Sequence, residues 1–107
     1  MTDTKGVRAF IVNLGNQGLG NIRDFVESVV PITDGQVNIF DLDGLGQQIQ
    51  GVFRNSEYRP GVDKIALNGH ITLNYLVGKT IQWMFPVFPV NILLWDAVNR
   101  RYIERTI

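Results

Sequence analysis

The sequence predicts an all-β domain, a small β-sandwich or jelly-roll-like fold of about seven or eight strands. The first reason is Asn68-Gly69, which separates two apolar runs rich in β-branched residues and is the strongest short-range signal for a β-hairpin. The second is the alternation of short apolar runs with turn-forming glycine, asparagine, aspartate and proline along the chain. The 107 residues suffice for one hydrophobic core, so residues 1–107 are expected to form a single domain.

The first half of the chain contains expected strands and one segment with two interpretations. Residues 7–14 are an apolar run followed by a glycine-rich loop, as is typical of a strand. Residues 22–30 have apolar side chains at helical spacing but end in β-branched residues before Pro31, so a short helical turn and a strand are equal alternatives. Residues 37–42 and 48–54 are expected strands, the second because its polar and apolar positions alternate.

The second half of the chain begins with the hairpin, whose arms are residues 64–67 and 70–77. In the second arm, successive side chains point to opposite faces, as in a half-buried strand, and residues 81–85 show the same alternation. Residues 90–98 are apolar on both faces and predict a strand between the core and another surface. Residues 101–107 are expected to form an edge strand.

Composition and charge exclude several classes of function. Ten Lys and Arg balance ten Asp and Glu, so no net field attracts nucleic acid, and none is expected as a partner. The chain has no cysteine for a disulfide or a thiolate metal site. The N-terminus lacks the apolar core of a signal peptide, and the longest apolar run, residues 81–98, is interrupted by Pro86 and Pro89, so no membrane association is expected. Because only 19% of residues are charged, some apolar surface is expected to face partners.

Motifs that carry chemistry are incomplete in this sequence. Residues 18–20 resemble the start of a dinucleotide-binding loop, but Arg23 stands at the third glycine position and no βαβ pattern follows. Residues 41–44 resemble part of a calcium loop without its closing glutamate and are interpreted as a turn. His70, the single histidine, is interpreted as a polar strand residue without a triad partner. We therefore predict no enzyme activity, no cofactor and no metal.

Aromatic and basic residues crowd the C-terminal part of the chain. Core packing is the simpler interpretation of the aromatic residues, and an interface anchor is the sharper one. Arginines near the end suit carboxylates across an interface, although a solvated strand explains them as well. The candidate interface residues are Trp83, Phe85, Phe88, Trp95, Arg100 and Arg101.

Two segments resemble parts of small bacteriophage virion proteins. Residues 40–56, Phe-Asp-Leu-Asp-Gly-Leu-Gly-Gln-Gln-Ile-Gln-Gly-Val-Phe-Arg-Asn-Ser, resemble a DL-GLG-QIQ-VFVDNS-like stretch of these proteins, although Arg54 departs from the pattern. Residues 78–89 resemble their GQTI…FPV…P strand, at a similar place in the order. The resemblance implies a capsid-associated protein such as a decoration (cement) or vertex protein, often a β-sandwich or jelly roll that assembles symmetrically.

The expected function is therefore that of a structural component of a bacteriophage virion, made in the bacterial cytoplasm. As a decoration protein it would bind the icosahedral shell, with the major capsid protein and copies of itself as partners. One alternative is a vertex protein that forms a penton or seats a fibre. Another is a carbohydrate-binding module, in which exposed Trp83 or Trp95 would stack on sugar rings beside Asn74 or Gln82.

Overall fold

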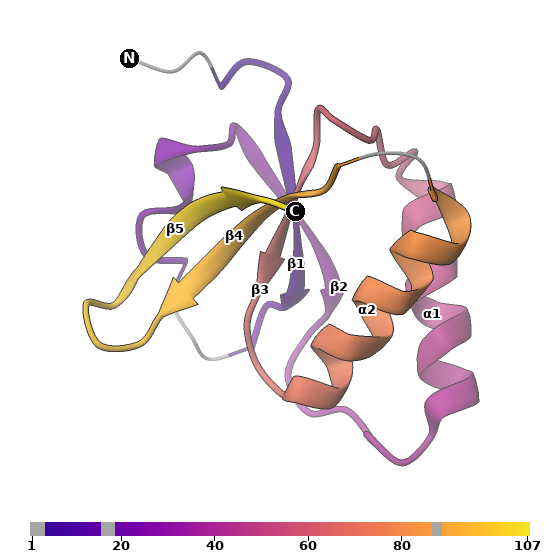
Figure 1. The fold of residues 1–107 in the computed structure, drawn as a ribbon. Helices are drawn as coiled ribbons and strands as arrows, with labels where there is room; N and C mark the ends of the chain where they lie inside the picture. Colours follow the sequence, from indigo (N-terminus) through magenta and orange to yellow (C-terminus); the bar gives the residue numbers. More distant parts are fainter. Residues whose placement is uncertain (1–3, 16–18, 87–88) are drawn as a thin grey trace.

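The computed structural model describes residues 4–15, 19–86 and 89–107, and these form an α/β fold rather than an all-β one (Figure 1). One sheet has the strand order β2-β1-β3-β4-β5, in which the first four strands are parallel and β5 is antiparallel to β4. The elements are β1 (Arg8–Asn13), a 3-10 helix η1 (Ile22–Asp24), β2 (Ser28–Thr33), α1 (Leu42–Asn55), β3 (Lys64–Leu67), α2 (Ile71–Met84), β4 (Asn91–Asp96) and β5 (Arg101–Thr106). The predicted sandwich or jelly roll is wrong.

The predicted hairpin at Asn68-Gly69 is wrong, because this turn joins β3 to a helix. Its failure explains why the predicted fold class is wrong. Gly69 has a φ of 72°, but Asn68 does not, so the hairpin turn that needs positive φ at both positions is absent. His70 is the N-cap of α2, and its Nδ1 accepts a hydrogen bond from the backbone N–H of Thr72. The residues expected to form strands at 70–77 and 81–85 belong almost entirely to α2. Its buried side chains recur at helical spacing: Leu73, Val77, Thr80 and Ile81.

The strands expected at 37–42 and 48–54 are also wrong, since α1 begins at Leu42. Three glycines lie within this helix and lower its intrinsic helix propensity. The sequence of this segment therefore favours a strand over a helix. Burial against the sheet outweighs propensity here. The buried side chains of α1 follow a four-residue spacing: Leu45, Ile49 and Phe53.

Other predicted elements are confirmed. The strands expected at 7–14, 64–67 and 101–107 correspond to β1, β3 and the edge strand β5, and β4 forms within the expected strand at 90–98. Both interpretations of 22–30 are realised in succession, because η1 is followed by β2. The absence of a βαβ pattern after residues 18–20 is only partly confirmed, because β1 and β2 are parallel strands joined through the short helix η1.

The sheet has a different layer on each face (Figure 1). Both α-helices lie on one face, and the 3-10 segment covers the other. β1, in the interior of the sheet, is buried on both faces, which explains its nearly continuous apolar sequence. The core on the helical side is formed by Phe10, Val12, Ile32, Ile65 and Ile92 against Leu45, Ile49, Phe53, Leu73, Val77 and Ile81. The core on the other side is formed by Ala9, Ile11, Ile22, Val26, Ala66, Leu93 and Tyr102.

A buried carboxylate joins the loop before β3 to the start of β1. Asp63 is fully buried, and its Oδ2 lies 2.7 Å from Nη2 of Arg8 while its Oδ1 lies 2.8 Å from Nη2 of Arg59. Arg8 also donates to the backbone carbonyl of Glu57 at 2.8 Å. Burial by itself would raise the pKa of Asp63, but hydrogen bonds from Arg59 and Arg8 outweigh it and lower this pKa below its ordinary value. Burial and then the charge of Asp63 raise the pKa of the adjacent Tyr58 to about 12.

We predict that Asp63→Ala lowers the free energy of unfolding by about 3–5 kcal/mol in urea titrations at neutral pH, because it leaves Arg8 without its buried partner. Arg59→Ala is the matched control and should lower it by about 1 kcal/mol or less, since this side chain is half exposed and its backbone N–H still donates to Asp63. An equal effect of both variants would contradict the assigned role of the buried carboxylate.

The same cluster predicts a dependence of stability on pH. The folded pKa of Asp63 is lower than the ordinary value of 3.8, so its contribution is complete above that value and is lost as the pH falls through the folded pKa. The stability difference between the wild type and Asp63→Asn should therefore be constant near neutral pH and shrink in acid. A difference that grew in acid would contradict this sign.

Candidate functional site

The order of the strands creates one topological switch point, between β1 and β3. From β1 the chain moves to β2 on one side, and from β3 it moves to β4 on the other, while β1 and β3 are themselves parallel neighbours. At such a point in an open α/β sheet, the connections leave the carboxyl ends of two adjacent strands in opposite directions. Ligands of such proteins bind in the crevice between these two connections. In this chain that edge carries Asn13, Asn68 and the start of α2 (Figure 1).

Two asparagines bind β1 to β3 at this edge. The backbone N–H of Asn13 donates to Oδ1 of Asn68 at 2.9 Å, and Nδ2 of Asn68 donates to the carbonyl of Asn13 at 2.6 Å. The Asn68 side chain thus acts as a further residue of the ladder, bonding both backbone groups of its neighbour. Asn68 is buried, so losing either bond would leave a polar group without water.

The side chain of Asn13 extends this arrangement to the loop after β2. Its Nδ2 donates to the carbonyl of Gly35 at 2.9 Å, and its Oδ1 accepts from the backbone N–H of Gly35 at 3.0 Å. Thr33, at the end of β2, donates from Oγ1 to the carbonyl of Val12 at 2.6 Å. The carboxyl ends of three adjacent strands are therefore held together before any ligand arrives.

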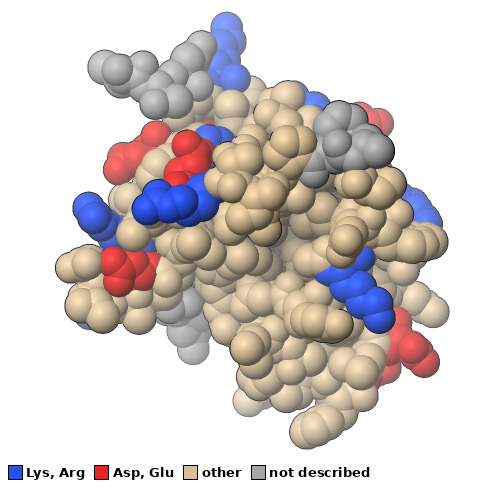
Figure 2. Space-filling model, viewed as in Figure 1, with Lys and Arg blue, Asp and Glu red and all other residues tan. Residues whose placement is uncertain are grey.

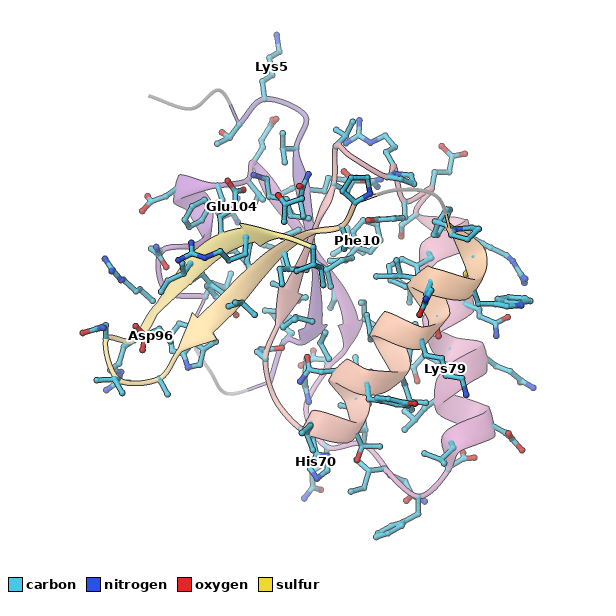
Figure 3. All side chains as sticks on the ribbon, viewed as in Figure 1. Lys5, Phe10, His70, Lys79, Asp96 and Glu104 are labelled. Atoms are coloured by element: carbon cyan, nitrogen blue, oxygen red, sulfur yellow. The ribbon has the colours of Figure 1, made fainter. Side chains whose placement is uncertain are left out.

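A third asparagine and the histidine complete the edge. Nδ2 of Asn74, in the first turn of α2, donates to the carbonyls of Asn68 and His70, both at 3.0 Å. His70 is exposed at the start of the helix (Figure 3). Because its Nδ1 accepts from Thr72, the neutral ring carries its proton on Nε2, which can donate to a ligand. The predicted polar strand residue is therefore a helix cap.

The N-termini of the two helices differ in charge. Asp41 is the N-cap of α1, and its side chain accepts from the backbone N–H of Gly44 at 3.1 Å. Asp43 lies in the first turn of the same helix. The calcium-loop resemblance at 41–44 is thus explained by a helix cap. α2 has no acidic residue in its first turn and is capped by His70. An anion at this edge would be repelled by carboxylates at α1 and favoured by the helix dipole and N–H groups at α2.

The predicted interface residues that the structure describes lie in two separate places, at the end of α2 and around the turn between β4 and β5. Trp83 is 66% exposed on α2, whereas Phe85 packs on Tyr58 with ring centroids 5.0 Å apart. Trp95 is partly buried and lies against Tyr102 on the opposite face of the sheet, at 5.0 Å. Arg100 lies in the turn between β4 and β5, Arg101 is the first residue of β5, and Phe88 lies outside the described residues.

The asparagines of the carboxyl edge were missed by the sequence interpretation. A signal existed, because Asn13 and Asn68 each follow an apolar run, but it has meaning only if the two runs are parallel neighbours. Among the described residues, no group of three or more His, Asp or Glu side chains is placed to hold a metal ion. Neither described helix is long and apolar enough to cross a membrane.

We predict that Asn68→Ala lowers the free energy of unfolding by about 1–3 kcal/mol, because it leaves the backbone N–H and carbonyl of Asn13 without partners. Asn55→Ala, at the exposed end of α1, is the control and should change it by no more than about 0.5 kcal/mol. Urea unfolding of both variants measures the difference, and equal stabilities would argue against the Asn13–Asn68 bridge.

Comparisons of this chain with protein-family models, with characterised proteins and with solved structures give no significant match. The resemblance to bacteriophage virion proteins therefore stays a prediction, and the function is argued from the site itself.

Proposed function

We propose that this chain is a ligand-binding α/β domain that holds a small anionic molecule of the nucleotide type at the carboxyl edge of its sheet. The observation that carries the proposal is the first turn of α2, which starts at the switch point between β1 and β3 and contains no acidic residue. The ligand's anionic group would accept from Nε2 of His70 and from backbone N–H groups of this turn other than those of Thr72 and Asn74, which already bond to His70. The asparagines behind the turn fix its position, which lowers the entropy lost on binding.

The balanced charge of the chain favours a small ligand over a polymer. A nucleic acid would need a basic stripe, and the charges of the chain balance. Amides and one imidazole instead suit a ligand with one anionic group and several hydrogen-bonding groups. Binding alone accounts for these groups, since the ring of His70 bonds to its own helix rather than to a carboxylate.

His70→Asp is the variant that tests this proposal. Aspartate is a good N-cap and keeps α2 folded, but it places a negative charge where the ligand's anion would lie. In a ¹⁵N NMR titration with adenosine monophosphate, we expect shifts at Gly69, Ile71 and Thr72 in the wild type, and affinity lower by about tenfold or more in His70→Asp.

The control is His70→Ser, a neutral N-cap, which should lower the affinity much less than His70→Asp does. Inorganic phosphate, titrated separately, distinguishes recognition of the anion alone from recognition of the whole nucleotide. The proposal fails if neither probe shifts the amides of this edge in the wild type, or if the aspartate and serine variants bind equally well.

The virion role is the alternative proposal, with the major capsid protein and copies of this chain as partners. It is favoured by large apolar side chains that α2 exposes on one outer stripe, namely Ile71, Tyr75 and Trp83. The four-residue spacing places Ile71 and Tyr75 on the same side of the helix, and Trp83 is exposed further along it. Such a stripe becomes buried when subunits assemble, and it also supplies the exposed tryptophan that the carbohydrate-binding alternative requires.

If the stripe mediates self-assembly, the protein should sediment as a homo-oligomer at high concentration, and Trp83→Lys should shift it toward the monomer by weakening association about tenfold or more. Val98→Lys, at a still more exposed apolar position away from α2, should leave the oligomer intact. A monomer at every concentration would remove this alternative, and stacking on sugars would instead appear as quenching of Trp83 fluorescence by oligosaccharides.

A further inference from the structure

The sheet is only partly covered on its helical face. α1 packs on β2 and α2 packs on β1, and the chain then passes from β4 to β5 through a tight turn instead of a third helix. The side of β3 and β4 that faces α2 is consequently open, and Leu94 there is 38% exposed. Figure 2 shows this face, where uncharged side chains surround a hollow between α2 and the β4–β5 hairpin.

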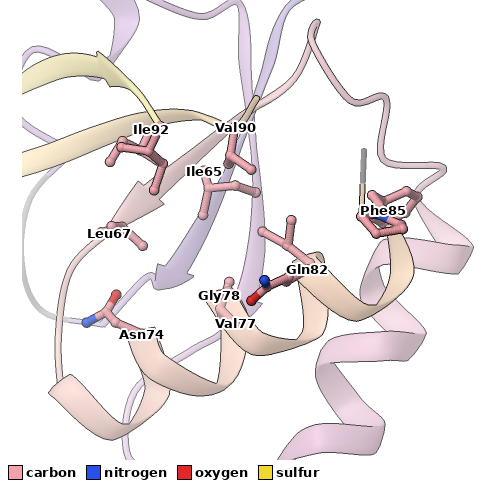
Figure 4. A pocket seen from close by; sticks show the side chains of 12 residues that line it. Ile65, Leu67, Asn74, Val77, Gly78, Gln82, Phe85, Val90 and Ile92 are labelled. Carbon is pink, nitrogen blue, oxygen red and sulfur yellow. The ribbon is translucent and has the colours of Figure 1, made fainter. Parts of the chain in front are cut away.

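A pocket of about 500 Å³ lies in this opening (Figure 4). Its floor comes from β3 and β4, and one wall is α2, whose Gly78 leaves room because it has no side chain. No lining side chain is charged. The volume and the mostly apolar lining are those of sites for small organic molecules. The lining includes Ile65, Leu67, Val77, Ile81, Val90 and Ile92.

One polar atom in the wall lacks a donor. Oδ1 of Asn74 is buried, and no donor among the described residues reaches it. The amide cannot turn to relieve this, because Nδ2 is held by the carbonyls of Asn68 and His70. Figure 4 shows the oxygen directed toward Leu67 and the pocket, with the nitrogen directed away from it. A buried acceptor of this kind favours a ligand that brings an N–H or O–H group.

We propose that this pocket binds a small, neutral and largely apolar molecule whose single N–H or O–H group donates to Oδ1 of Asn74. The absence of charged side chains from the lining separates it chemically from the carboxyl edge, where an anion is favoured. The two sites meet at Asn74, whose nitrogen supports the edge while its oxygen faces the pocket. The proposal stands whether or not a nucleotide binds at that edge.

Indole and 1-methylindole are the probes, because they share a ring system and only indole has an N–H donor. In ¹⁵N NMR titrations at millimolar concentration, indole should shift the resonances of Gly78, Val77 and the side-chain amide of Asn74. 1-Methylindole should bind about tenfold more weakly, since it leaves Oδ1 without a donor.

Gly78→Leu is designed to fill the pocket without damaging the fold. A Cβ at Gly78 meets no atom within 4 Å, and leucine is a better helix former than glycine, so the variant should fold and melt at a higher temperature. Its indole affinity should fall about tenfold or more, because the side chain occupies the site. Gly51→Leu, an equally open helical position on α1, is the matched control and should keep wild-type affinity.

Three results would overturn the proposal. One is the absence of shifts at the pocket with indole, and another is equal affinity for the two probes. The third is a dimer that buries this face and dissociates in Gly78→Leu, which would make the opening an interface between copies of the chain. The proposal is supported if indole binds more tightly than 1-methylindole, and if indole binding is weaker in Gly78→Leu but not in Gly51→Leu.

Discussion

The parallel pairing of β1 with β3 is the constraint on which the rest of this structure depends. Within the ladder, Ala9 pairs with Lys64 and Ile11 with Ala66. Side chains continue the same register beyond both ends, since Arg8 binds Asp63 at one end and Asn13 binds Asn68 at the other. A slip of this register would leave a buried carboxylate and buried amides without partners. These polar groups therefore fix the register of β1 against β3, which apolar packing alone would leave adjustable.

The same pairing determines where the switch point of the sheet lies. Because β1 and β3 are adjacent and their connections diverge, this point lies at the Asn13–Asn68 end rather than at the Arg8–Asp63 end. The charged groups of Arg8, Arg59 and Asp63 pair with one another and tie the start of β1 to the loop before β3. At the amide edge His70 is exposed at the start of α2, and the first turn of α2 has no acidic residue, unlike that of α1.

The open half of the helical face has a different origin, which is the way the chain ends its sheet. A hairpin adds β5 to β4 without a crossover helix, so apolar side chains that a longer α/β domain would cover stay accessible beside α2. The pocket at Asn74 and the exposed stripe with Trp83 lie on different sides of this one helix. A single element therefore carries three surfaces: its first turn, its pocket wall and its outer stripe.

The sequence by itself determined the position of several strands, because apolar runs bounded by turn residues locate β1, β3 and β5 and contain β4. It also determined the balanced charge and the lack of thiol chemistry. It could not separate helix from strand at α1 and α2, where glycines and β-branched residues weaken helix propensity and the apolar positions fit both periods.

Only the tertiary structure decided between those periods, through burial of side chains spaced by four residues against the sheet. The candidate site shows the same limit: Asn13 and Asn68 are visible as residues that follow apolar runs, yet they lie 55 positions apart. Their proximity arises from parallel pairing, a long-range contact that no local pattern encodes.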